Sequence, residues 1–277
     1  WMGVDTYLPA IKIGAPIRSG GLVRVVKSDN PALPVGTLVF ATPGWQEYAI
    51  VTERDQVVPD GVDPTAALSI FGITGITAYF GLLDIGRPTA GETVVVSGAA
   101  GSTGSIAGQI AKIKGCRVVG IAGSDEKCSW LTEELGFDAA INYRSQNVAA
   151  KLRETCPDGI DVYFDNVGGD ILEAAIGRLA LRGRVVMCGA ISQYNDSAPS
   201  PGPRNLSALI SKRGRMEGFI VLDYLKRSGE AIQDLATWLG EGRLTFTVDV
   251  MDGLDSAPDA LMKLFDGGNT GKMMVRL

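Results

Sequence analysis

The stretch VVVSGAAGSTG, residues 94–104, constrains the fold of this chain more than any other. It begins with a β-branched run of the kind that is buried on both faces of a parallel sheet. Small residues follow, and residues 105–112 (SIAGQIAK) then show a helical pattern. A strand, a turn of small residues and a helix, in this order, predict a βα unit that can bind a dinucleotide.

The glycine fingerprint in this stretch reads Ala99-x-Gly101-x-x-Gly104, with alanine where G-x-G-x-x-G has its first glycine. Gly101 lets the backbone approach a pyrophosphate, and Gly104 lets the helix pack tightly on the strand. The helix N-terminus offers unpaired N–H groups and about half a positive charge to phosphates. The alternative is a tight turn that binds nothing. We predict a nucleotide site because the strand and the helix patterns both flank the turn.

From residue 93 onward, strand and helix patterns alternate, which is typical of a doubly wound parallel sheet. We predict an α/β fold with a Rossmann domain over residues 66–237. Short strands broken by Pro and Gly predict a partial all-β domain over residues 1–65, and residues 238–277 return to short strands around one helix. The expected strands are 22–26, 38–41, 45–51, 93–97, 117–122, 139–142, 162–165, 184–188, 217–222, 245–250 and 272–276. The expected helices are 66–81, 103–114, 125–135, 146–155, 170–181 and 257–265, with a Pro/Ser-rich loop at 197–203.

The sequence contains no histidine. Catalytic zinc almost always uses histidine ligands, and Ser-His-Asp or Cys-His catalysis needs an imidazole, so we expect no metal and neither of these mechanisms. The four cysteines, at positions 116, 128, 156 and 188, are widely spaced and form no C-x-x-C pair. This spacing predicts buried thiols in a reducing compartment rather than a zinc site or a disulfide framework.

The charge pattern and the chain ends limit the partners. The net charge is −5 with both signs mixed along the chain, so we expect no nucleic-acid partner. No apolar run reaches the roughly 18 residues of a membrane span, and no signal peptide opens the chain, so we expect a soluble cytoplasmic protein with no membrane partner. The first residue is Trp1 rather than methionine. We therefore expect a fragment edge there, with some strands of the all-β domain missing.

The choice between the two nicotinamide cofactors depends on the end of the second strand of the sheet. An NAD-binding unit places Asp or Glu about 20 residues beyond the last glycine, but Ser124 stands there, followed by Asp125-Glu126-Lys127. An alternative is that Ser124 only caps the next helix. A neutral strand end with Lys127 one turn later fits a 2′-phosphate, and Tyr143 at the tip of the third strand can donate to the same group. We predict NADP(H) rather than NAD(H).

Two further loops follow strands at the carboxyl edge of the predicted sheet, where ligands bind in such folds. They are residues 165–169 (DNVGG) and 188–195 (CGAISQYN). Asn166 and Tyr194 can direct polar groups to a ribose or a substrate from these loops, although Tyr194 also fits an exposed loop tyrosine. Gly72 and Gly75 predict a helix that packs closely against a neighbouring helix or a flat ligand, and both alternatives stay open.

Long blocks of the chain resemble a known family. These blocks are GITAYFGLLDIG, VVSGAAGSTGSIAGQIAKIKGC, GSDEKCSWLTEELGFDAAINY, CPDGIDVYFDNVGGD, CGAISQYN, MEGFIVLDY and GGNTGK. They are similar to the zinc-independent medium-chain dehydrogenases/reductases, and among these to the prostaglandin and alkenal/enone double-bond reductases. The resemblance covers almost the whole chain and implies that the all-β part is a GroES-like catalytic domain. It also implies further residues before the point where this chain begins, so that closure of the substrate site is in doubt.

The resemblance implies a role for individual residues. Tyr194 is implied beside the substrate carbonyl as the catalytic residue, and Ala41 and Thr42 align loosely with a substrate-contacting stretch. Lys127 and Tyr143 match the 2′-phosphate contacts. The full set of implied cofactor contacts is Ala100, Gly101, Ser102, Thr103, Gly104, Lys127, Tyr143, Asn166, Cys188, Gly189, Ala190, Ile191, Ser192, Tyr194, Phe219, Ile220, Val221 and Asn269.

The reaction implied by the family is the NADPH-dependent reduction of the carbon–carbon double bond of α,β-unsaturated ketones and aldehydes. Hydride goes to the β-carbon while negative charge builds on the carbonyl oxygen, and preorganised donors stabilise that oxygen. The candidate donors are the Tyr194 hydroxyl and a cofactor ribose hydroxyl. A quinone reductase and a catalytically idle NADPH-binding protein are the alternatives, and a homodimer stays open.

Overall fold

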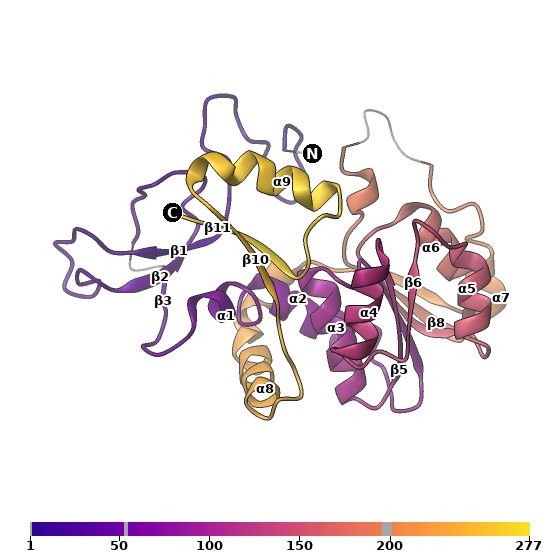
Figure 1. Ribbon diagram of the computed structural model, residues 1–277. Coiled ribbons are helices and arrows are strands. Elements are labelled where there is room, and N and C mark those ends of the chain that lie inside the picture. The colour runs from indigo at the N-terminus through magenta and orange to yellow at the C-terminus, as the bar shows by residue number, and fades with distance from the viewer. Residues whose placement is uncertain (1, 53–54, 196–200) are drawn as a thin grey trace.

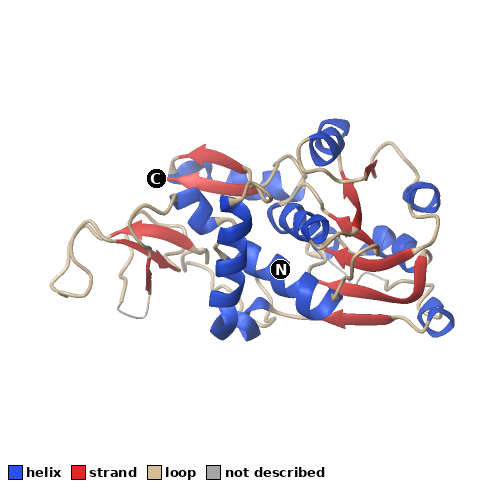
Figure 2. Ribbon diagram, turned by 90° about the horizontal axis from the view of Figure 1, so that it is seen from below, coloured by secondary structure: helices blue, strands red, loops and turns tan. Residues whose placement is uncertain are grey.

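The computed structural model describes residues 2–52, 55–195 and 201–277 (Figures 1 and 2). The described residues form three sheets. The first is antiparallel and contains β1 (Gly21–Arg24), β2 (Leu38–Ala41) and β3 (Gln56–Val57). The second is a parallel pair of β10 (Val248–Asp252) and β11 (Lys272–Arg276), which Figure 1 shows between the other two sheets.

The third sheet has six parallel strands in the order β6-β5-β4-β7-β8-β9. These strands are β4 (Thr93–Ser97), β5 (Arg117–Ala122), β6 (Ala139–Asn142), β7 (Ile160–Asp165), β8 (Leu179–Met187) and β9 (Arg215–Gly218). Strand β4 pairs with β5 on one side and with β7 on the other, so the order reverses between β4 and β7. This is the doubly wound order of a Rossmann fold, and it confirms the predicted fold class.

The helices lie on both faces of the six-stranded sheet, as Figure 2 shows. The α-helices are α1 (Pro64–Leu68), α2 (Ile73–Phe80), α3 (Ser102–Ile113), α4 (Asp125–Glu133), α5 (Val148–Thr155), α6 (Gly169–Ile176), α7 (Ala208–Lys212), α8 (Ser228–Gly240) and α9 (Ala257–Phe265). A π-helical turn, η1 (Gly81–Gly86), extends α2, and three 3₁₀ turns are η2 (Ile191–Gln193), η3 (Val221–Arg227) and η4 (Leu254–Ser256).

Strand β4 supplies side chains to both hydrophobic cores. Successive residues of a strand point to opposite faces. Val94 and Val96 belong to the cluster that includes α2, α3 and α8, whereas Val95 belongs to the cluster that includes α5 and α6. All three valines are fully buried. The β-branched run at the start of the fingerprint is therefore covered on both faces, as its composition predicts.

Two expectations for the N-terminal part of the chain are wrong. Residues 45–51 are not a strand, because the positive φ of Gly44 turns the chain and Trp45 N then bonds to Ile17 O. The third strand is β3 instead. The helix expected over residues 66–81 is broken between α1 and α2. A Cβ on Gly75 would lie 1.8 Å from Ile70 O, so this glycine fits the turn of its own chain rather than a neighbouring helix or ligand.

Farther along the chain, several helices and strands begin or end at other residues than the sequence predicts. Helix α6 ends at Ile176 and β8 begins at Leu179, so the expected helix 170–181 is too long and the expected strand 184–188 too short. The strand expected at 217–222 ends at Gly218, and the one expected at 245–250 is shifted to β10. Helix α8 was missed, although Ala231, Leu235 and Trp238 mark a buried face at helical spacing. Of the predicted loop 197–203, residues 197–200 lie outside the described residues.

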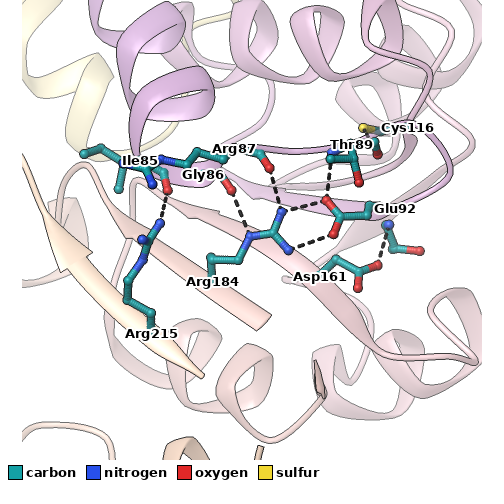
Figure 3. Close-up of polar contacts among 10 residues, drawn as sticks. Ile85, Gly86, Arg87, Thr89, Glu92, Cys116, Asp161, Arg184 and Arg215 are labelled. Atoms are coloured by element: carbon teal, nitrogen blue, oxygen red, sulfur yellow. Dashed lines mark hydrogen bonds and ion pairs between the residues drawn. The ribbon is translucent and has the colours of Figure 1, made fainter. Parts of the chain in front are cut away.

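An arginine network holds the amino edge of the six-stranded sheet together (Figure 3). Arg184 in β8 donates to Gly86 O at 2.9 Å and to Arg87 O at 2.9 Å, and binds both carboxylate oxygens of Glu92 at 2.8 and 2.6 Å. Arg215 in β9 donates to Ile85 O. The last carbonyls of a helical turn lack partners within the helix, so these guanidinium groups cap η1. They also fix the connection from η1 to β4.

We predict that Glu92→Gln lowers the free energy of unfolding by about 1–2 kcal/mol at neutral pH. Hydrogen bonds to charged groups contribute about 1.5–3 kcal/mol, and partial exposure of both side chains reduces this. Burial alone would raise the pKa of the Glu92 carboxyl, but hydrogen bonds from Arg184 and Thr89, with the Arg184 charge, hold it below its usual 4.5. The stabilisation is therefore present above pH 4.5 and lost as the pH falls through the folded-state pKa.

Urea unfolding at pH 7 and at pH 3 measures this difference. The control is Glu134→Gln at an exposed position, which should change stability by less than about 0.5 kcal/mol. A difference between wild type and Glu92→Gln that did not shrink at the lower pH would contradict the prediction.

Candidate functional site

The residues predicted to bind the cofactor lie on loops that follow the strands of the six-stranded sheet. The fingerprint follows β4, Lys127 follows β5, Tyr143 follows β6 and Asn166 follows β7. Because the strands are parallel, these loops meet at the carboxyl edge. The reversal of strand order between β4 and β7 is the place where open α/β sheets bind their ligands.

The turn of the fingerprint is made by Gly98. Its φ is +56°, and Gly101 N donates to its carbonyl at 3.0 Å. The positive φ that a tight turn needs thus falls one residue before Ala99, which explains why alanine is accepted at the first glycine position. A Cβ on Gly104 would lie 2.3 Å from Gly98 O, so glycine is required there for helix α3 to meet the strand.

Helix α3 presents an open N-terminus to the carboxyl edge. Its N-cap, Gly101, has extended backbone angles and makes no side-chain cap hydrogen bond. The Ser102 hydroxyl donates to Thr74 in α2 at 3.0 Å, which ties the loop to that helix. A helix start with uncapped amides and without a Cβ at its N-cap is the cradle that a pyrophosphate requires.

The C-terminal segment crosses this loop. Gly271 N donates to Ala100 O at 2.8 Å, and Gly101 and Gly271 form an isolated parallel bridge. Asn269 is buried, and its side-chain amide donates to Gly271 O at 3.0 Å. The structure therefore brings Asn269, which the family resemblance implied as a cofactor contact, to the phosphate loop.

Two cations and a phenol gather beyond the ends of β5 and β6. Lys127 Nζ donates to the carbonyls of Gly267, at 2.7 Å, and Asn269. The Tyr143 hydroxyl lies 3.0 Å from the place of a Cβ on Gly123, and the Arg144 guanidinium lies 5.9 Å from the Tyr143 ring centroid. Burial, and after it the Arg144 charge, lowers the pKa of Lys127. This concentration of positive charge and donors suits a phosphate dianion.

Arg144 was missed by the sequence reasoning. It directly follows Tyr143, and its guanidinium donates to Asp266 O in the C-terminal segment. The sequence signal that could have identified Arg144 is its position next to Tyr143, an expected phosphate contact. Of the acids that follow Ser124, Asp125 accepts from Asn142 at 2.7 Å, and Ser124 caps α4 by accepting from Lys127 N at 3.3 Å. The capping alternative for Ser124 is thus present together with the cations.

The loops after β7 and β8 are bonded to each other and to β4. Asn166 Nδ2 donates to Ser97 O at 2.7 Å. Cys188 N and Gly189 N donate to Asp165 O at 2.9 and 3.0 Å, and Ser192 Oγ donates to Val167 O at 2.6 Å. Residues 188–192 therefore lie next to Asn166 at the point where the strand order reverses.

Tyr194 closes the loop after β8. Its hydroxyl oxygen accepts from Ala190 N at 3.2 Å, and the side chain is 41% exposed. A Cβ on Gly189 would lie 3.1 Å from this hydroxyl, so the ring lies over its own loop. Burial, and after it the charge of Asp165, raises the pKa of the Cys188 thiol to about 12. This thiol stays protonated and is no nucleophile.

The remaining predicted residues are farther from the fingerprint. Phe219, Ile220 and Val221 follow the carboxyl end of β9, and the Phe219 ring lies against Gly81. Ala41 ends β2 and is buried, and Thr42 follows it. Ala41 belongs to the three-stranded sheet, which Figure 1 shows apart from the six-stranded sheet. The substrate role of both residues stays a prediction.

Within the described ranges, no three Cys, Asp or Glu side chains come together in a way that could hold a metal ion. The four cysteines are free, with Cys116 and Cys156 buried and Cys128 and Cys188 partly buried. The described helices include none that is long and apolar enough to cross a membrane.

Comparisons with known proteins show the family of this chain. Residues 102–238 match the family model described as zinc-binding dehydrogenase, and residues 1–58 match the N-terminal domain of oxidoreductase. The chain is 50% identical to the putative NADP-dependent oxidoreductase YfmJ of Bacillus subtilis, over 94% of this chain and 78% of that protein. It is 42% identical to the NADP(+)-dependent 2-alkenal reductase of Nicotiana tabacum, over 98% of this chain and 80% of that protein.

This chain belongs to the zinc-independent medium-chain dehydrogenases/reductases of the enone and alkenal reductase type. The crystal structure of CurA from Vibrio vulnificus in complex with NADPH superposes with a TM-score of 0.94. It is 40% identical and matches 99% of this chain and 83% of that one. The predicted family is therefore confirmed, and NADP(H), the cofactor expected from the sequence, is the cofactor of this reductase family. The roles of single residues and the three domain boundaries stay predictions.

We predict that alanine at Gly104 lowers the stability of the protein, whereas alanine at Gly101 lowers its affinity for NADPH. Gly104→Ala places a methyl group against Gly98 O and should cost about 1–3 kcal/mol of stability. In Gly101→Ala the nearest atom is Gly98 O at 3.2 Å and φ is −80°, so stability should change by less than about 1 kcal/mol. The new methyl instead fills the place of the pyrophosphate, and NADPH affinity should fall by about tenfold or more.

Thermal unfolding and fluorescence titration with NADPH measure the two effects separately. Wild-type NADPH affinity in Gly101→Ala would show that the pyrophosphate binds elsewhere.

Proposed function

We propose that this protein is an NADPH-dependent reductase of the carbon–carbon double bond in α,β-unsaturated ketones and aldehydes. The observation that carries the proposal is the loop after β8, which places the Tyr194 hydroxyl beside Asn166 and Gly189 at the reversal point of the sheet. Support comes from the relative whose name describes a 2-alkenal reductase.

The chain's own groups supply the positioning and the stabilisation of charge. When bound, the cofactor supplies the hydride that goes to the β-carbon of the substrate. As that bond forms, negative charge builds on the carbonyl oxygen, and the Tyr194 hydroxyl is the donor that stabilises it. The Ala190 N–H donates to the Tyr194 oxygen, which polarises the phenol and strengthens it as a donor. Protonation of the α-carbon comes from solvent.

The cofactor preference follows from the donors beyond β5 and β6. A lysine ammonium has three protons to donate, and the carbonyls of Gly267 and Asn269 take two of them from Lys127. The third is available for the 2′-phosphate, together with the Tyr143 hydroxyl and the Arg144 guanidinium. Lys127 in this arrangement binds the phosphate and the C-terminal segment at the same time.

Steady-state oxidation of NADPH tests the proposed function. The acceptors are a short series of α,β-unsaturated ketones and aldehydes, their saturated analogues, and a matched series of quinones. We expect turnover with the enones and enals, with the double bond reduced and the carbonyl intact. Turnover confined to quinones would identify a quinone reductase, and NADPH binding without any turnover would identify an idle binding protein.

Tyr194→Phe should lower kcat with the enones and leave NADPH affinity within about twofold. One oxyanion donor is worth about 2.7–4 kcal/mol, and because a second donor can share the charge we expect about 1.5–2.5 kcal/mol, or about 10–70-fold in kcat. A large rise in the NADPH dissociation constant with unchanged kcat would make Tyr194 a cofactor contact only.

We predict that Lys127→Ala weakens NADPH by tenfold or more and barely changes NADH. A hydrogen bond to a charged group is worth about 1.5–3 kcal/mol. Any effect of losing the contacts to Gly267 and Asn269 is the same for both cofactors, so the ratio of the two dissociation constants isolates the 2′-phosphate contact. Fluorescence titration measures both constants. Lys112→Ala is the control. Lys112 pairs with Asp138 and lies at the C-terminal end of α3, whereas the phosphate loop is at the N-terminal end of that helix. Equal losses for NADPH and NADH would rule out the assignment.

A further inference from the structure

Asp165 is a buried carboxylate at the reversal point of the six-stranded sheet. It is the last residue of β7, its exposed fraction is 0%, and among the described residues no cation pairs with it. A buried charge is costly unless hydrogen bonds compensate for lost water, so its presence here requires a reason.

The contacts of this carboxylate are all with neutral donors. Oδ1 accepts from Ser97 Oγ at 2.8 Å, Tyr163 OH at 2.9 Å, Val167 N at 3.1 Å and Gly168 N at 3.0 Å. Ser97 Oγ in turn accepts from Asn166 N at 2.9 Å, so its own proton is directed to Asp165. An ionised carboxylate only accepts hydrogen bonds, and this set of donors fits it. Neutral donors hold the group and leave its net negative charge in place.

The charge lies under the loops that carry Asn166 and Tyr194. The proposed function places the substrate carbonyl at the Tyr194 hydroxyl, so the nicotinamide that donates the hydride binds at these loops. Asn166 follows Asp165 directly, and the Asp165 carbonyl accepts from Cys188 N and Gly189 N. Two neighbouring groups respond to the charge. Burial, and after it Asp165, raises the pKa of the Cys188 thiol to about 12 and raises that of the Tyr163 phenol well above its usual value. The hydrogen bonds from Cys188 N and Gly189 N place the loop after β8 directly beside Asp165.

The nicotinamide ring is neutral in NADPH and carries a positive charge in NADP⁺. A fixed negative charge in a poorly solvated site acts over several ångströms and stabilises the charged form more than the neutral one. We propose that Asp165 favours the oxidised over the reduced nicotinamide and thereby promotes hydride donation, an inference that rests on the proposed function. Asp165 acts through space and through the loops it holds, as a positioning residue.

Asp165→Asn tests the charge separately from the shape. Among the residues that the structure describes, Oδ2 accepts only from Gly168 N, at 3.2 Å, so an amide with its oxygen in the Oδ1 position keeps the contacts of Oδ1. The control is Asp161→Asn on the same strand. Asp161 accepts from Thr93 N at 2.8 Å at the amino edge and lies about 13 Å away along β7. Thermal unfolding first establishes that each variant is folded.

The measurement is the ratio of the dissociation constants for NADP⁺ and NADPH, obtained by calorimetric titration at one pH and ionic strength. We expect Asp165→Asn to weaken NADP⁺ about tenfold relative to NADPH, and Asp161→Asn to leave the ratio within twofold. Equal weakening of both cofactors by Asp165→Asn would reduce Asp165 to a purely structural group and overturn the inference.

Tyr163→Phe provides a second test if the asparagine variant does not fold. It removes one neutral donor and keeps the carboxylate charge, so the ratio should shift about twofold in the opposite direction, toward tighter NADP⁺. A ratio that is unchanged, or that shifts toward NADPH, would overturn the inference. Absence of NADPH binding by the unchanged protein would overturn the proposed function, and this inference with it.

Discussion

The parallel pairing of β4 with β7 is the constraint on which the other parts of this protein depend. Val94, Val95 and Val96 bury this strand on both faces, so the two helical layers can only assemble around it. Because the strand order reverses at this pair, the loops that follow β4 and β7 diverge and leave room for a ligand between them. Ser97 and Asp165 end the two strands, and the hydrogen bond between their side chains, at 2.8 Å, fixes both loops at that point.

The two edges of the same sheet use charge in different ways. At the amino edge Arg184 and Glu92 neutralise each other. Arg184 also donates to backbone carbonyls, Glu92 accepts from Thr89 N, and the pair serves stability. At the carboxyl edge, Lys127, Arg144 and Asp165 form no ion pair with any described residue. The side chains of Lys127 and Arg144 donate to backbone carbonyls, and the Asp165 carboxylate accepts from neutral donors. This separation suits the proposed binding of NADP(H), with its 2′-phosphate at Lys127 and Arg144 and the ring that becomes a cation near Asp165.

The C-terminal segment makes the site a product of distant parts of the chain. Gly271 bonds to the fingerprint loop, and residues 266–269 are held by Lys127 and Arg144. Lys127 and Arg144, the proposed 2′-phosphate contacts, therefore also organise the segment that leads into β11. The family resemblance implied Asn269 as a cofactor contact, but only the fold shows why a residue so near the end of the chain lies at the phosphate loop.

The sequence by itself determined the elements whose signals are local. Strands β4, β5 and β6 and helix α9 begin and end where their patterns predict, because β-branched runs and helical spacing with Gly, Pro or polar ends carry the information within a few residues. The fingerprint, the family and NADP(H) also followed from the sequence. The tertiary structure alone decided the break between α1 and α2, the loss of the expected strand at 45–51, the position of Arg144 and the donors around Asp165. Each of these depends on groups that are far apart in the sequence, or on a backbone turn whose angles the residue types permit but do not require.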